Sequence, residues 1–134
     1  MLVQVVDYHN NNIAIDPSRV IKIREAALAD EPKQSVLVDY VVGGTFVKGT
    51  IADITKLFGT YIRLAHFHAP NGTPIYLNAD GVAGFTVDSK YDGASVAVVA
   101  KGFDNPRVPA RNRIGLKETV AEAEAILKST ALLA

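Results

Sequence analysis

Apolar and polar residues alternate along much of this chain, and the same alternation occurs in both halves. The runs Val3–Tyr8 and Tyr61–His68 open the halves and have the character of β-strands, in which successive side chains point to opposite faces. Asparagine, glycine and proline then gather in turn clusters at residues 10–12 and 70–73. Each half is therefore predicted to begin with a hairpin, whose returning strands are Ile13–Ile15 and Ile75–Leu77.

Two or three further strands are predicted in each half. In the first half they are Val20–Arg24, Ser35–Val42 and, after a tight turn at Gly43-Gly44, Thr45–Lys48. In the second half they are Val82–Val87 and Ala94–Ala100, with the pattern resuming at Ile114–Lys117. The polar segments 26–34 and 88–93 between strands are predicted to be surface loops.

Each half is predicted to end in a helix with a marked start. Thr50 with Asp53, and Thr119 with Glu122, have the spacing of a capping box. Apolar residues then recur at intervals that give each helix one apolar face. The predicted faces are Ile51, Ile54, Leu57 and Phe58 in the first helix, and Val120, Ala123, Ile126 and Leu127 in the second.

The two halves also match in sequence. Residues 48–54 match residues 117–123 at an offset of 69, and residues 13–20 match residues 75–82 at an offset of 62. We therefore predict a β-rich α+β protein built from a tandem duplicated unit, with four to five antiparallel strands followed by one helix and a pseudo-two-fold relation. The units are 1–60 and 61–134, the second with an inserted loop at 103–113, packed edge to edge or face to face as one compact domain.

Several pieces of this pattern resemble known families. Ile13–Val20, Ile75–Val82, the Gly43-Gly44 pair and the helices that start with threonine resemble pieces of the short flagellar FlbD-like proteins. This resemblance implies a fold rather than an activity. The order of strands and helix is also similar to that of the Pur-alpha and Whirly repeats, whose members bind single-stranded nucleic acid.

Composition limits the classes of function. The chain has 134 residues, is 49% hydrophobic and contains no cysteine, which excludes disulfides and thiol chemistry. Its 14 basic and 14 acidic residues give zero formal charge, whereas non-specific nucleic-acid binders usually have a basic excess. No apolar run approaches the roughly 18 residues of a membrane span, and the N-terminus lacks a signal-peptide pattern. We expect no membrane association, no Sec export, and a cytoplasmic or virion location.

The inserted loop is the best candidate for a binding site. It carries Phe103 and three arginines, Arg107, Arg111 and Arg113, on a segment held between strands. Guanidinium groups can hold the carboxylates of a partner protein or the phosphates of a nucleic acid. Because the net charge is zero, we expect a protein partner first and nucleic acid second.

Two histidines are weaker candidates for metal ligands. His66 and His68 fall on one face of the predicted strand, but a protein metal site usually needs three or four ligands, and the sequence offers no partner at a recognisable spacing. We therefore expect no metal and no cofactor. No phosphate loop, nucleophile elbow, dinucleotide fingerprint or zinc-protease motif occurs, so we also expect no enzyme activity.

The function predicted from sequence is that of a non-enzymatic structural or interaction protein. It would act by self-association or by docking onto a larger assembly, with a phage virion or an accessory role as the expected setting. The alternative is a single-stranded nucleic-acid-binding or regulatory module. In that case Lys101, the three loop arginines and the aromatic residues of the strands would contact the nucleic acid.

Overall fold

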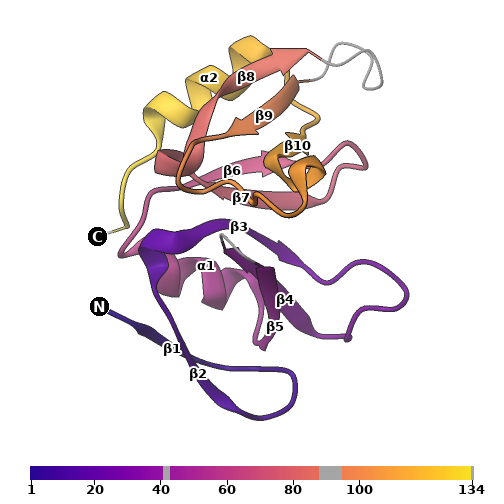
Figure 1. Ribbon diagram of the computed structural model, residues 1–134, viewed down its shortest axis with the longest axis vertical. Helices are drawn as coiled ribbons and strands as arrows, with labels where there is room; N and C mark the ends of the chain where they lie inside the picture. The colour runs from indigo at the N-terminus through magenta and orange to yellow at the C-terminus, as the bar shows by residue number, and fades with distance from the viewer. Residues whose placement is uncertain (41–42, 88–94, 134) are drawn as a thin grey trace.

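The computed structural model describes residues 1–40, 43–87 and 95–133 (Figure 1). The elements of the first half are β1 (Val3–Val6), β2 (Asn12–Ile15), the 3₁₀ turn η1 (Pro17–Arg19), β3 (Val20–Glu25), β4 (Ser35–Tyr40), β5 (Gly43–Lys48) and α1 (Ile51–Gly59). Those of the second half are β6 (Leu64–His68), β7 (Pro74–Asn78), η2 (Ala79–Gly81), β8 (Val82–Val87), β9 (Ser95–Val99), η4 (Pro109–Asn112), β10 (Arg113–Gly115) and α2 (Val120–Ser129).

The described strands form three antiparallel sheets, which confirms the β-rich α+β class. A five-stranded sheet has the order β5-β4-β3-β7-β6, so it takes strands from both halves. A three-stranded sheet has the order β10-β9-β8, and β1 and β2 form a separate hairpin. The five-stranded sheet crosses the middle of the molecule, with α1 and the hairpin on one side of it and α2 with the three-stranded sheet on the other (Figure 1).

Among the described elements both halves share the order hairpin, 3₁₀ turn, three strands and helix, and the second half adds η4 between β9 and β10. In both, an Asx residue caps the 3₁₀ turn, with Asp16 accepting from the Ser18 N–H and Asn78 from the Asp80 N–H. Both third strands have a register shift after their first residue, at Val20 and at Val82. Within the described residues each half thus has five strands and one helix, in agreement with the predicted four to five strands and one helix, while their origin by duplication stays a prediction.

Some boundaries differ from those predicted. Gly43 and Gly44 do not form the turn but are the first residues of β5, paired with Tyr40 and Asp39 of β4. Glycine fits at position 44 because a Cβ there would lie 3.0 Å from the Leu37 side chain, whereas nothing lies within 4 Å of a Cβ at position 43. The strand β6 begins only at residue 64, since residues 61 and 62 still donate to the Phe58 carbonyl at the end of α1. The predicted loop 88–93 and the end of the predicted strand 35–42 lie outside the described residues.

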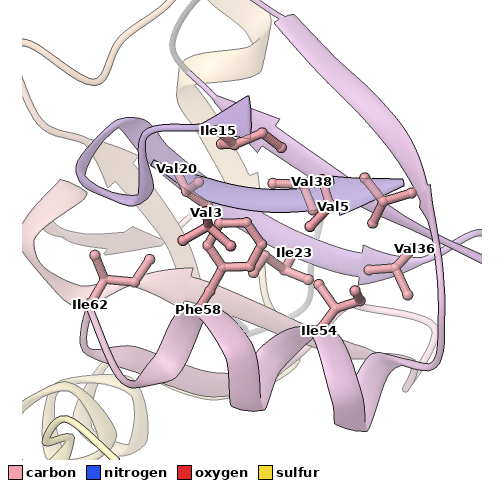
Figure 2. Packing of buried hydrophobic residues seen from close by; sticks show 11 residues of the cluster. Val3, Val5, Ile15, Val20, Ile23, Val36, Val38, Ile54, Phe58 and Ile62 are labelled. Carbon is pink, nitrogen blue, oxygen red and sulfur yellow. The ribbon is translucent and has the colours of Figure 1, made fainter. Parts of the chain in front are cut away.

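Two hydrophobic cores lie on opposite faces of the five-stranded sheet. In the first, α1 directs Ile54 and Phe58 against the sheet, and the hairpin adds Val3 and Val5 (Figure 2). The second lies under α2 and the three-stranded sheet and contains Phe67, Leu77, Ala97, Leu116 and Ala123, among others. The registers explain the two faces, because Ile23 of the first core is opposite Tyr76, whereas its neighbour Lys22 is opposite Leu77 of the second.

The helices start at the predicted threonines. Thr119 and Glu122 form a complete capping box, whereas Thr50 accepts from the Asp53 N–H without a described bond in return. The shorter aspartate side chain accounts for this difference. The predicted face of α1 is wrong at Leu57, which is 38% exposed. That residue lies at the edge of the stripe, so Ile54 and Phe58 fill the core without it.

The tail after α2 returns to the first half. The helix ends at Ser129, and the Leu133 N–H donates to the Gly59 carbonyl at 2.9 Å. A Cβ on Gly59 would lie only 2.7 Å from the Leu133 side chain, so the absence of a side chain at 59 permits this contact. The tail therefore docks against the end of α1 and does not extend α2.

Candidate functional site

The inserted loop 103–113 is an ordered segment held by its own asparagines. The buried Asn105 side chain accepts from the backbone N–H groups of Arg107 and Val108, at 3.0 and 3.2 Å. Asn112 closes the loop, since its side chain accepts from the Asn105 N–H and donates to the Asn105 carbonyl. Asparagine can do both because its amide carries a donor and an acceptor. The loop therefore presents its remaining side chains from a fixed backbone.

The structure places the four predicted binding residues in three different environments. Phe103 packs against the second core and faces Gly81, so it contributes to packing. The Arg111 guanidinium donates to the Asp39 carboxylate of β4 and is partly occupied by that bond. Arg107 and Arg113 are exposed as well, and no hydrogen bond or ion pair of their side chains is described. The four residues therefore do not form one cluster.

Asp39 is the centre of a buried charge cluster that the sequence analysis did not find. Its side chain is 9% exposed and lies 3.7 Å from the Lys22 ammonium, in addition to its bond with Arg111. Burial lowers the pKa of Lys22, an effect that Asp39 opposes and that Arg24 and Arg111 increase. A buried carboxylate needs such partners to remain charged. The cluster ties the loop of the second half to the sheet of the first.

The two predicted histidines do lie on one face of β6. Their ring centroids are 5.0 Å apart, and His66 stacks on Tyr76, its cross-strand partner, at 4.5 Å. His68 Nδ1 lies 2.8 Å from Glu118, which also accepts from the His68 backbone N–H. Glu118 is the acidic partner that sequence spacing did not reveal, since it comes from a segment 50 residues away.

This histidine cluster does not have the arrangement of a metal site. Among the described residues, no group of three or more histidine, aspartate or glutamate side chains is arranged to hold a metal ion. Burial lowers the pKa of His66, with His68 adding to the effect and Glu118 opposing it. Glu118 instead fixes the end of β6, next to the bond from the Lys117 N–H to the His68 carbonyl.

A cleft of about 540 Å³ lies at the start of α1. It is open to solvent, and its lining residues are Glu25, Ala26, Gln34, Ser35, Val36, Gly49, Thr50 and Ile51. Two of its polar groups are already used, because Ser35 Oγ donates to the Pro32 carbonyl and Thr50 Oγ1 accepts from the Asp53 N–H. Among the described residues no hydrogen bond joins the Glu25 carboxylate to either of these hydroxyls.

Two strand edges are the more informative surfaces. Within the described ranges β2 pairs only with β1, and β8 only with β9. Neither Asn12–Ile15 nor Val82–Val87 contains a charged residue or a proline, the features that usually protect an edge strand. The sequence alone did not show which strands form these edges, although the absence of charge in the two segments was visible.

The outer edges of β5 and β6, the two terminal strands of the five-stranded sheet, are each closed by backbone contacts. The exposed side of β5 is bridged by Asp7 opposite Val47, and the Tyr8 N–H donates to the Phe46 carbonyl at 2.9 Å. At β6 the corresponding closure is the bond from the Lys117 N–H to the His68 carbonyl, at 2.8 Å. These closures contrast with β2 and β8, for which no such bond is described.

Comparison with known protein families, with curated protein sequences and with solved structures finds no match. The resemblance to flagellar FlbD-like proteins and to Pur-alpha and Whirly repeats therefore stays a prediction from sequence. Neither α1 nor α2 has the length or apolar character that a helix needs to cross a bilayer.

Proposed function

We propose that this protein is a non-enzymatic structural or interaction protein that acts by self-association within a larger assembly. The observation that carries the proposal is the pair of uncharged strand edges, β2 and β8, each paired on one side only within the described residues. An edge strand of this kind offers a row of backbone donors and acceptors to another strand.

The position of the two edges supports this function. The hairpin β1-β2 and the strand β8 lie at opposite ends of the long axis of the molecule (Figure 1). One molecule can therefore contact two neighbours at once. The zero net charge also favours association, because molecules without net charge repel one another little.

The test is the mass in solution, measured by light scattering over a series of protein concentrations. We expect discrete or concentration-dependent oligomers that are indifferent to a short single-stranded oligonucleotide. A protein that stays monomeric up to about millimolar concentration, where even weak contacts form, would contradict the proposal.

The same measurement tests the nucleic-acid alternative, in which the exposed side chains of Lys101, Arg107, Arg111 and Arg113 would contact the phosphates. If this alternative holds, the mass rises on addition of the oligonucleotide at low salt and falls again at moderate salt, because phosphate contacts release counterions. That result would place nucleic-acid binding ahead of self-association.

A further inference from the structure

The way in which the two halves of the chain are joined indicates how two molecules join. The halves meet through antiparallel pairing of β3 with β7, in which Lys22, Ile23 and Arg24 are opposite Leu77, Tyr76 and Ile75. This pairing joins the third strand of the first half to the second strand of the second half. It thereby links β5-β4-β3 and β7-β6 into one continuous five-stranded sheet. It is an association of two similar units through strand edges.

The structure shows which strands correspond to these two in the other half. The hairpins have the same register at an offset of 62, since Val3 is opposite Ile15 and Ala65 is opposite Leu77. The strand β2 thus corresponds to β7. The register shifts of β3 and β8 occur at the same offset, between Val20 and Lys22 and between Val82 and Gly84. The strand β8 thus corresponds to β3.

The corresponding pair, β8 with β2, does not form within one molecule. Within the described residues β1 and β10 also pair with one strand each, but the bonds from Tyr8 to Phe46 and from Lys117 to His68 join the chain just after β1 to β5 and the chain just after β10 to β6. No such bond is described for β2 and β8, and these two strands lie at opposite ends of the molecule (Figure 1). Building on the proposed self-association, we propose that β8 of one molecule pairs with β2 of the next, antiparallel and in the register of β3 with β7. Gly84, Phe85 and Thr86 would then be opposite Ile15, Ala14 and Ile13.

This contact is heterologous, because it joins two different surfaces. Each molecule offers one β8 and one β2, so the assembly grows head to tail and forms either a ring or an open filament. The partner in this contact is a second copy of this chain. We infer this because the corresponding strands β3 and β7 already pair in the same way inside each molecule.

The side chains beside the two junctions differ in a complementary way. Inside the molecule, Ile21 approaches η2 so closely that a Cβ on Gly81 would lie 2.5 Å from its side chain. At the corresponding positions between molecules, Ala83 replaces Ile21 and Arg19 replaces Gly81. Inside the molecule the strand carries the large residue and the 3₁₀ turn the small one. Between molecules the strand β8 would carry the small residue and the turn η1 the large one. Both Ala83 and Arg19 are exposed in the single molecule.

One bond of the internal junction cannot be repeated between molecules. The buried Asn78 amide donates to the Val20 carbonyl at 2.9 Å across the internal junction. The corresponding residue is Asp16, whose ionised carboxylate has no proton to donate to a carbonyl. The junction between molecules is therefore weaker than the internal one, and we expect it to be reversible and dependent on concentration.

The test uses charge at the expected contact between Ala83 and Arg19. Ala83→Lys brings two positive charges together and should raise the dissociation constant by about tenfold or more. Adding Arg19→Glu to that variant should restore association, since the charges are then opposite. Ala52→Lys, at an exposed position of α1 away from both edges, is the matched control and should leave the mass unchanged.

A mixing experiment tests the head-to-tail geometry. Ala14→Pro removes a backbone donor from β2, and Ala83→Lys blocks β8, so each variant keeps one working edge. Each variant alone should be monomeric, and their equimolar mixture should stop at the dimer. Circular dichroism of each variant establishes that it is folded. Because the charge exchange does not involve proline, it decides the question even if Ala14→Pro does not fold.

The outcomes separate this inference from the proposed function. Wild-type oligomers whose mass is unaffected by Ala83→Lys, with or without Arg19→Glu, would overturn the pairing of β8 with β2 while self-association stands. A wild-type protein that remains monomeric at every concentration would overturn both. Loss of association in Ala83→Lys, its recovery with Arg19→Glu and a dimeric mixture would establish the junction.

Discussion

Glu31 shows how a single side chain closes a long loop in this protein. Its carboxylate accepts two bonds from the Arg24 guanidinium, at 2.9 and 2.7 Å, and further bonds from the backbone N–H groups of Ala27 and Leu28. The Glu31 side chain is 10% exposed. Its bonds fix the connection between β3 and β4, which the sequence analysis could predict only as a polar loop.

Replacing Glu31 by Gln should destabilise the protein and change its response to acid. The Arg24 bonds, helped by those from Leu28 and Ala27, lower the Glu31 pKa from 4.5 to about 2. The unfolded chain therefore takes up this proton first as the pH falls. The stabilisation is complete above about pH 4.5 and is lost as the pH falls towards 2.

Urea unfolding at several pH values measures this effect. We expect Glu31→Gln to cost about 1.5 kcal/mol at neutral pH and progressively less as the pH is lowered. Glu124→Gln, at an exposed position of α2, is the control and should cost little. An equal cost of Glu31→Gln at pH 7 and pH 3 would contradict the assigned role of the ion pair.

Gly81 permits the close contact between the two halves. A Cβ there would lie 2.5 Å from Ile21 Cδ1 and 3.0 Å from the Phe103 ring. We expect Gly81→Ala to destabilise the protein by about 1–2 kcal/mol, as overpacking does. Ile21→Val removes the obstructing Cδ1 atom, so the double variant should recover part of this loss. Thermal unfolding of the single and double variants measures the coupling, and purely additive effects would show that Ile21 does not make the contact.

At the scale of elements, the two helix starts offer a matched comparison. The Glu122 carboxylate accepts from the Thr119 backbone N–H at 3.0 Å, whereas no such bond is described for Asp53. We therefore expect Glu122→Ala to cost about 0.5–1 kcal/mol and Asp53→Ala to cost less. Chemical denaturation measures both. A larger cost for Asp53→Ala would show that the capping box is not what stabilises the start of α2.

The inserted loop requires a selective test, because its arginines have different roles. Arg111 bonds to the buried Asp39, so its removal leaves a buried carboxylate with one cationic partner fewer. Arg111→Ala should therefore destabilise the fold by about 1–3 kcal/mol. In contrast, the double variant Arg107→Ala with Arg113→Ala removes two exposed side chains and should leave the free energy of unfolding unchanged. If the loop binds a partner through these two residues, only association weakens, and light scattering measures it. Unchanged assembly would remove the loop from the binding surface.

Local patterns predicted most elements, whereas the contacts between elements were not predictable. The turns, alternations and threonine caps are properties of short segments, so the strands and helices appear near their expected places. The bond between Arg111 and Asp39 joins residues 72 positions apart, and that between His68 and Glu118 joins residues 50 apart. Such pairs depend on how the halves are joined. For the same reason the sequence left edge-to-edge and face-to-face packing open and did not reveal the edges of β2 and β8.

At the scale of the whole molecule, the two halves exchange side chains across the shared sheet. Ile21 of the first half belongs to the second core, and Tyr76 of the second half packs against the first. The docked tail adds the bond from Leu133 to Gly59, and Arg111 adds its bond to Asp39. Loss of either core would therefore expose surface of the other. This interdependence favours one unfolding transition over two.

Removing one large side chain from each core tests whether the halves unfold together. Phe58 in the first core and Phe67 in the second are fully buried. Phe58→Ala and Phe67→Ala should each cost about 3–5 kcal/mol and should each lower the midpoint of the same single transition. Calorimetry at a fixed protein concentration gives the comparison, because a two-state transition has equal calorimetric and van't Hoff enthalpies. Two separate transitions, each shifted by only one variant, would mean that the shared sheet does not couple the cores. A single transition would instead mean that a strand junction such as β3 with β7 is strong enough to make two units behave as one.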